Sequence, residues 1–305
     1  LCYMANTFIN SSDFQGRLKE TTQIGAELIG DGSAEADAEL LALVVESLLK
    51  TGLKEFQVSV GHADFFKSLL KEADLPEEME LELREFISNK NMFGVRELLD
   101  AAELSEQLKE ALAKVPDLFG SVEILDVAES CAISEKAKAS LQRLRRIYEL
   151  LTFYGYEKYI TFDLGVVSKY QYYTGIIFQA YTYGTGEPIA KGGRYDTLMD
   201  HFGKPAPAIG FVCVADRLLT ALNRQNIKLD VDRPLTLLLY YPEESRKAIA
   251  CAGELRSQGG PVELCCMAQD RTVGTYRDYA SRKGTNRLCY YKDGNLVAEF
   301  LSTEQ

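Results

Sequence analysis

Residues 163–217 read DLGVVSKYQYYTGIIFQAYTYGTGEPIAKGGRYDTLMDHFGKPAPAIGFVCVADR. Apolar, β-prone segments alternate here with glycine-rich turns, and three polar clusters, QYYTG, GGRYD and ADR, stand at the segment ends. Strands carry few glycines unless a turn, a bulge or a closely approaching ligand requires them. The stretch therefore predicts a sheet whose strand ends form a pocket, with the rest of the chain supporting that pocket.

Length and composition exclude several classes of protein. A chain of 305 residues, 46% of them hydrophobic, predicts two domains and a substantial core. The formal net charge of -11 disfavours a general nucleic-acid binder, which needs a basic surface to displace counterions. No apolar run is long enough to cross a bilayer, so no membrane partner is expected.

The cysteines and histidines make a metal site improbable. Seven cysteines are irregularly spaced and include no Cys-x-x-Cys pair, which favours buried free thiols in a reducing cytoplasm. The two histidines, His62 and His201, complete no zinc pattern. His62 follows a predicted strand and is interpreted as a hydrogen-bonded loop residue without a catalytic role. No metal and no cofactor are expected.

The N-terminal part predicts two strands. Residues 1–9 alternate like a strand, and residues 16–30 contain a β-prone centre in which alternation places Gln23 and Glu27 on one face. Pocket-lining groups and a polar, solvent-facing strand edge are equally compatible with that face. The apolar start at Leu1, without a cap, indicates that an upstream part of this domain is missing.

The next segments are predominantly helical. Ser33 is expected to cap a helix that ends at Gly52, and a short strand at residues 56–61 follows. Residues 63–156 carry leucines at helical spacing among many charges, which predicts a helical insertion. Its basic run at residues 143–146 is compatible with nucleic-acid contact, but a solvated outer helix face is the favoured interpretation.

A second domain is predicted after the glycine-rich stretch. Residues 216–226 are helical, residues 227–233 form a polar connection, and Pro234 begins a βαβαββ pattern of about seventy residues. This gives a first domain of residues 1–228 and a small α/β domain of residues 229–305.

Four segments together carry a family resemblance. GRLKETTQIGAELIG, QYYTGIIFQ, GGRYD and PAPAIGFVCVADRL, in this order, resemble the catalytic core of histidyl-tRNA synthetase, a class II aminoacyl-tRNA synthetase. The resemblance covers roughly residues 1–62 and 160–225, and the C-terminal module resembles a shortened anticodon-binding domain. It implies an α+β fold with an antiparallel sheet flanked by helices, and a homodimer formed through a motif upstream of Leu1.

Two positions that hold catalytic arginines in that family carry other residues here. Ile9 follows Phe8 in the second motif, and Ser168 stands in the place of an arginine in the segment before Tyr172. Neutral side chains supply no bidentate phosphate clamp, and one such loss typically costs about 3–4 kcal/mol. Lys169 is a poor substitute, although Arg217 of the third motif is retained. The chain is therefore expected not to activate amino acids.

The part that resembles the amino-acid pocket matches the family's pattern more closely than the phosphate-binding positions do. Its carboxylate, amide and phenol groups are the partners that an imidazole needs for specific recognition. The predicted binding residues are Gln23, Glu27, Tyr172, Tyr173, Gly192, Gly193, Arg194 and Tyr195. Gln171 and Gln179 stand where the synthetases carry acids, which weakens capture of an ammonium group.

Each of these residues also has a purely structural interpretation. The tyrosines would serve as core aromatics with one satisfied hydroxyl, and the glycines would only permit a tight turn. Arg194 and Arg217 would pair with the neighbouring acids Asp196 and Asp216. These alternatives stay open at the level of sequence.

The sequence retains the synthetase core but lacks two of the arginines that handle phosphate. In this it resembles the synthetase paralogues that serve as regulatory subunits of ATP phosphoribosyltransferase. That resemblance implies a non-catalytic subunit in histidine biosynthesis that assembles with the short-form catalytic subunit, activates it and carries feedback by histidine. An active histidyl-tRNA synthetase is the main alternative. A tRNA-binding relic that uses the C-terminal module and residues 143–146 is a third.

Overall fold

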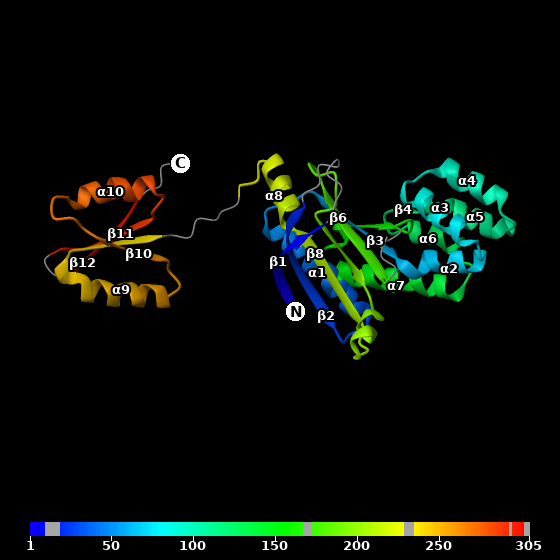
Figure 1. Cartoon of the computed structure of the whole chain (residues 1–305), viewed down its shortest axis with the longest axis horizontal. Helices are drawn as coiled ribbons and strands as arrows, with labels where there is room; N and C mark the ends of the chain where they lie inside the picture. The colour runs from blue at the N-terminus through cyan, green and yellow to red at the C-terminus, as the bar shows by residue number, and fades with distance from the viewer. Residues whose placement is uncertain (10–18, 167–171, 229–234, 293–294, 302–305) are drawn as a thin grey trace. The chain divides into compact units, whose positions relative to one another are not determined.

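The structure is a computed structural model that describes residues 1–9, 19–166, 172–228, 235–292 and 295–301 (Figure 1). Two compact units make up the chain, unit 1 at Leu1–Lys228 and unit 2 at Leu229–Gln305. Three predicted features lie outside the described residues, namely the turn after Ile9, most of the polar connection before Leu235 and the turn after Lys292.

Unit 1 is built on an eight-stranded sheet with the strand order β1-β2-β8-β7-β6-β3-β5-β4. The strands are β1 Cys2–Phe8, β2 Glu20–Ile29, β3 Phe56–His62, β4 Phe119–Gly120, β5 Ile160–Asp163, β6 Ile176–Thr182, β7 Ala190–Arg194 and β8 Ala208–Val214. Neighbouring strands run antiparallel, except β3 and β5, which are parallel. The α+β class with a helix-flanked sheet is confirmed, and the parallel pair was not predicted.

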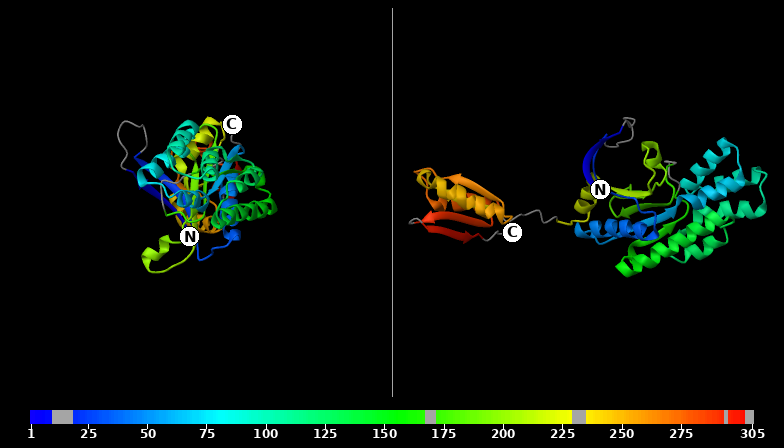
Figure 2. Two further views of the ribbon diagram at one scale, coloured as in Figure 1. Left: turned by 90° about the vertical axis from the view of Figure 1, so that its right-hand side faces the viewer. Right: turned by 90° about the horizontal axis from the view of Figure 1, so that it is seen from below.

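The described part of unit 1 contains eight α-helices. They are α1 Ala34–Lys50, α2 Ala63–Ala73, α3 Glu77–Ser88, α4 Met92–Ala101, α5 Glu106–Lys114, α6 Ile124–Glu129, α7 Glu135–Tyr154 and α8 Ala215–Arg224. Ser33 caps α1 as predicted, because its hydroxyl accepts a hydrogen bond from Ala36 N at 3.1 Å. The long helices α1 and α7 pack together below the sheet, whereas α2 to α6 gather beside β4 (Figures 1 and 2).

The basic run in α7 is engaged within unit 1. Arg143 binds the buried Asp37 carboxylate at 2.6 Å and also the carbonyls of Gly32 and Ser33. The next two arginines pair with acids as well, Arg145 with Asp126 and Glu129, and Arg146 with Glu35 and Glu149. The prediction of a solvated helix face is therefore wrong for Arg143, and all three guanidiniums already have carboxylate partners.

His62 is a buried cap rather than a loop residue. It is the last residue of β3, and its Nδ1 accepts a hydrogen bond from Asp64 N at 3.2 Å at the start of α2. Burial lowers the pKa of His62 from 6.5 to about 3, and the positive charges of Arg143, Lys136 and Arg194 act in the same direction. The imidazole is thus neutral over the physiological range.

This shift predicts a specific pH dependence of stability. Because the pKa of His62 is lower in the folded state, the unfolded state binds the proton first, and stability is lost as the pH falls from 6.5 toward about 3. Between pH 8 and pH 5 the loss from this group is about 2 kcal/mol. His62→Asn, which keeps a capping oxygen, should lose correspondingly less between these two pH values in urea unfolding. An equal loss of stability between pH 8 and pH 5 in both proteins would contradict the lowered pKa of His62.

Unit 2 is a four-stranded sheet with the order β10-β9-β11-β12 and a helix on each face. Its elements are β9 Thr236–Tyr240, α9 Ser245–Ser257, β10 Val262–Cys266, α10 Val273–Arg282, β11 Arg287–Lys292 and β12 Asn295–Phe300, which confirms the predicted βαβαββ order. The apolar run of β9 is buried on both sides, since Leu237 packs toward α10 and Leu238 toward α9.

The remaining composition-based expectations concern thiols, metals and membranes. All seven cysteines are free, and Cys131, Cys213 and Cys289 are buried, whereas Cys2 and Cys266 are exposed. Among the residues that the structure describes, no group of three metal-ligating side chains occurs. None of the helices in these ranges is both long and apolar enough to cross a membrane.

Candidate ligand-binding site

The centre of the candidate site is a carboxylate held by a tyrosine. Glu27 of β2 lies opposite Gly210 of β8, and a side chain at Gly210 would collide with the Glu27 carboxylate. The carboxylate therefore extends across β8, where it accepts a hydrogen bond from the hydroxyl of Tyr195, immediately after β7. Residues that are 168 positions apart in sequence thus meet on the sheet face that α1 does not cover.

Burial governs the ionisation of this pair. Partial burial raises the pKa of Glu27, although the hydrogen bond from Tyr195 opposes the shift. The pKa of Tyr195 is raised as well, first by burial and then by its hydrogen bond to Glu27. The phenol consequently stays protonated and continues to donate to the carboxylate.

Two more tyrosines, Tyr172 and Tyr173, lie beside the pair. The ring centroids of Tyr172 and Tyr173 lie 4.5 Å apart, and Tyr172 meets Tyr195 edge to face at 6.1 Å. The Tyr173 ring covers Gly193, where a Cβ would lie 2.7 Å from two ring carbons. The structure therefore brings together Glu27, Tyr172, Tyr173, Gly193 and Tyr195, which were predicted from sequence.

Tyr3 is a site residue that sequence analysis missed. Its ring covers Gly25, where a Cβ would approach ring carbons to 2.5 Å, and Tyr3 and Gly25 are paired across β1 and β2. Burial raises the pKa of Tyr3, and the charge of nearby Glu27 contributes. Gln23 shares this sheet face but is separated from Glu27 by the glycine that accommodates the Tyr3 ring. The alternation of β2 was a usable signal for Gly25, whereas nothing in β1 singled out Tyr3.

Alternation along β7 corrects two of the predicted binding residues. The GGRY segment is largely a strand and not a turn, so Gly193 and Tyr195 face the tyrosines while Gly192 and Arg194 face the helices. A Cβ at Gly192 would meet the Phe178 ring at 2.5 Å and the Gly210 carbonyl, so this glycine permits close strand packing. Arg194 is 1% exposed. Neither residue is placed to contact a ligand beside Glu27.

Arg194 instead belongs to a buried ion cluster behind the site. Its Nη2 lies 2.6 Å from Asp37 Oδ1, and Arg143 contacts the other oxygen of that carboxylate at 2.6 Å. Arg194 also pairs with Asp196 at 3.0 Å, as its structural interpretation proposed. Burial raises the pKa of Asp37, and the two guanidiniums oppose this. The cluster joins α1, α7 and β7 directly beneath Tyr195.

Of the positions that correspond to phosphate-handling arginines, Ile9 and Arg217 lie among the described residues. Ile9 is exposed at the end of β1, and Ser168, Lys169 and Gln171 lie outside the described residues. Arg217 in α8 pairs with Glu187 and donates to the Pro188 carbonyl at 3.0 Å. Its expected partner Asp216 instead accepts a hydrogen bond from Thr22 N at 2.7 Å.

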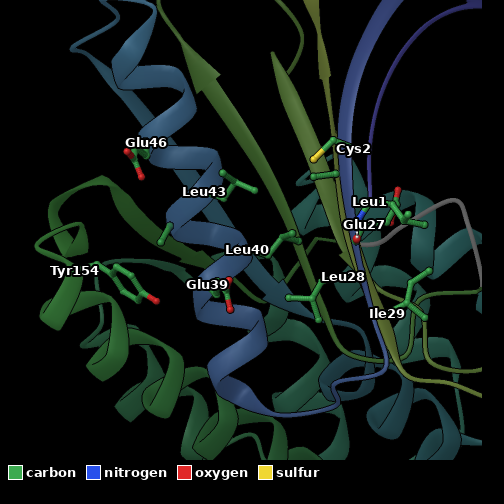
Figure 3. A pocket seen from close by; sticks show the side chains of 12 residues that line it. Leu1, Cys2, Glu27, Leu28, Ile29, Glu39, Leu40, Leu43, Glu46 and Tyr154 are labelled. Carbon is green, nitrogen blue, oxygen red and sulfur yellow. Dashed lines mark hydrogen bonds between the residues drawn. The ribbon is translucent and has the colours of Figure 1, made fainter.

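A cavity of about 590 Å³ lies between β2 and α1 (Figure 3). Ala26 and Leu28 of β2 line it together with Leu40 and Leu43 of α1 and Tyr154 of α7. Since Ala26 and Leu28 alternate with Glu27, the cavity is on the sheet face opposite the tyrosines. Glu39 and Glu46 of α1 also line it, and among the described residues Glu27 is the only one that it shares with the predicted site.

Comparison with known proteins agrees with this geometry. The sequence model of the family described as Histidyl-tRNA synthetase matches residues 1–218. A protein of Acetivibrio thermocellus, named ATP phosphoribosyltransferase regulatory subunit, is 39% identical over 297 residues, which cover 97% of this chain and 71% of that protein. A protein of the same name from Desulforamulus reducens is 40% identical, with coverages of 96% and 73%. The chain belongs to the family of ATP phosphoribosyltransferase regulatory subunits.

Solved structures place this family among the synthetase-like folds. A structure from Bacillus halodurans, titled ATP phosphoribosyltransferase regulatory subunit/histidyl-tRNA synthetase, superposes with a TM-score of 0.72 at 34% identity, and the match covers 91% of this chain and 70% of that one. A histidyl-tRNA synthetase from a Nostoc species gives a TM-score of 0.70 at 19% identity, and the match covers 97% of this chain and 74% of that one. At this level of identity the match shows the fold alone. The resemblance drawn from four sequence segments is thereby confirmed.

Proposed function

We propose that this chain is a non-catalytic subunit that binds the short-form catalytic subunit of ATP phosphoribosyltransferase, activates it and mediates feedback by histidine. Family membership supports the partner, because a regulatory subunit requires a catalytic one. We further infer a cytoplasmic location, from the biosynthetic role, and a homodimer, from the resemblance to class II synthetases.

The hydrogen-bonded pair of Glu27 and Tyr195 carries the histidine part of this proposal. An imidazole N–H needs a fixed acceptor, and the Glu27 carboxylate is oriented by the Tyr195 hydroxyl and half-buried beside aromatic rings. Partial exclusion of water strengthens a hydrogen bond to such an acceptor. The exposed Tyr172 ring offers a wall against which a flat heterocycle can stack.

The charges at the described arginine positions favour a protein that binds histidine over a synthetase. Transfer of a nucleotidyl group requires fixed cations aimed at the developing negative charge. Arg217 is instead paired with Glu187, and the apolar Ile9 follows the last residue of β1. Binding of histidine without adenylation is therefore the chemistry that these residues support best. Histidine-dependent ATP–pyrophosphate exchange by the purified chain would overturn this proposal in favour of a synthetase.

Tyr195→Phe tests the pair directly. Removal of the hydroxyl leaves the Glu27 carboxylate without its donor, and we expect the affinity for histidine to fall about tenfold in a calorimetric titration. Tyr183→Phe is the matched control, because Tyr183 is 78% exposed and lies outside the site. Titrations with and without the catalytic subunit separate the candidate site from a subunit interface. Binding that needs the partner and is unaffected by Tyr195→Phe would contradict the assignment.

A further inference from the structure

The first helix of the insertion, α2, contacts the backbone beside the candidate site through two hydrogen bonds. Lys67 in the second turn of α2 donates from its ammonium group to the Tyr173 carbonyl at 2.6 Å. At the start of the same helix, Ala63 N donates to the Gly175 carbonyl at 2.8 Å. Short, charge-assisted hydrogen bonds are among the stronger protein contacts. The helix thus holds both ends of the three-residue segment that begins with Tyr173.

The other side of this segment is tied to the strand that carries Tyr195. Thr174 N donates to the Arg194 carbonyl at 2.8 Å, and the Thr174 hydroxyl accepts from Asp196 N at 2.9 Å. Segment 173–175 therefore lies between α2 and the end of β7, with hydrogen bonds to both. A ligand that shifts the backbone of segment 173–175 together with the Tyr173 ring therefore also shifts the carbonyls that α2 contacts.

The helix itself is well placed to pass such a displacement on. Its residues Phe65, Phe66 and Leu69 are buried in the main core, and α2 packs against both α5 and α7. Packed cores shift between discrete arrangements rather than deform gradually. Lys67 is half-buried, and that burial lowers its pKa, which is consistent with a site where loss of the carbonyl partner would be costly.

We propose that Lys67 is a positioning residue that couples occupancy of the Glu27–Tyr195 site to the helical insertion formed by α2–α7. The inference rests on the proposed function only for its probe, histidine. Lys67 fixes the position of the Tyr173 backbone, whose ring lies over Gly193. A ligand that moves this backbone therefore also moves α2. The insertion then presents a different surface when the site is occupied.

Hydrogen exchange on the full chain, with and without saturating histidine, tests this coupling. Histidine should change the exchange of the α2 amides in the unaltered protein, and Lys67→Met should reduce this change about tenfold while calorimetry still detects histidine binding. Lys67→Arg, which keeps a donor, should restore most of the change. Lys71→Met is the matched control, since Lys71 is exposed on the same helix.

Each outcome of this experiment is decisive for one of the two proposals. An unaltered protein that binds no histidine, alone or with the catalytic subunit, overturns the proposed function. Binding that leaves α2 exchange unchanged, or a full change in Lys67→Met, overturns the coupling. If Lys67→Met does not fold, Lys67→Leu, which also lacks a donor, takes its place, and it should lose at least about half of the change. A full change in Lys67→Leu also overturns the coupling.

Discussion

Asp37→Ala is expected to lower the free energy of unfolding of unit 1 by about 3–5 kcal/mol, because it leaves two guanidiniums without their shared carboxylate. Asp37 is fully buried, and the side chain of Arg194 is only 2% exposed, so water cannot replace the lost partner. Removing one member of a buried ion cluster is far more costly than replacing the whole cluster with apolar residues. Urea unfolding followed by circular dichroism measures the effect.

Two comparisons make this result specific. Glu149→Ala removes an exposed partner of Arg146 on α7 and should cost less than about 1 kcal/mol. The double variant Asp37→Leu with Arg194→Met replaces charge by apolar volume and should recover a large part of the loss. A loss below about 1 kcal/mol for Asp37→Ala itself would mean that Asp196 and the backbone carbonyls suffice for Arg194.

The buried cluster also marks the limit of what the sequence could predict. In the sequence, Asp37 is recognisable only as an acidic residue in the first turn of the helix that follows Ser33, where it favours the positive end of the dipole. Its true partner, Arg194, is 157 residues away. Hydrophobic periodicity reports which face of an element is buried, but it does not identify which distant charge meets another inside the core. For the same reason, the sequence did not predict the place of Tyr3 in the site or the ion pair between Arg217 and Glu187.

Local patterns predicted the elements well wherever period and capping agreed. The helix after Ser33, the strand at Phe56–His62 and the C-terminal βαβαββ module all follow from such signals. The GGRY segment misled because adjacent glycines normally indicate a turn. Here Gly192 and Gly193 lie in strand β7, where one admits a neighbouring strand and the other admits the Tyr173 ring. Once the segment is known to be a strand, its alternation separates Gly193 and Tyr195, which face the tyrosines, from Gly192 and Arg194, which face the helices.

Gly210→Ala should weaken histidine binding about a hundredfold with little loss of stability. The three atoms nearest to a Cβ at this position all belong to the carboxyl end of Glu27, so the side chain and not the backbone must move. A displaced carboxylate leaves both the Tyr195 hydroxyl and the imidazole of the ligand without their acceptor. Calorimetric titration with histidine measures the change in affinity.

Gly186→Ala is the control for this variant, because no atom lies within 4 Å of a Cβ at that glycine. The pair of substitutions adds the same methyl group, so any difference in histidine affinity reports the position of the Glu27 carboxylate. An equal affinity in both variants would show that the carboxylate makes no contact with the ligand. Reduced affinity in Gly210→Ala with an unchanged thermal midpoint would place histidine over β8, between the carboxylate and the tyrosines that the sheet holds beside it.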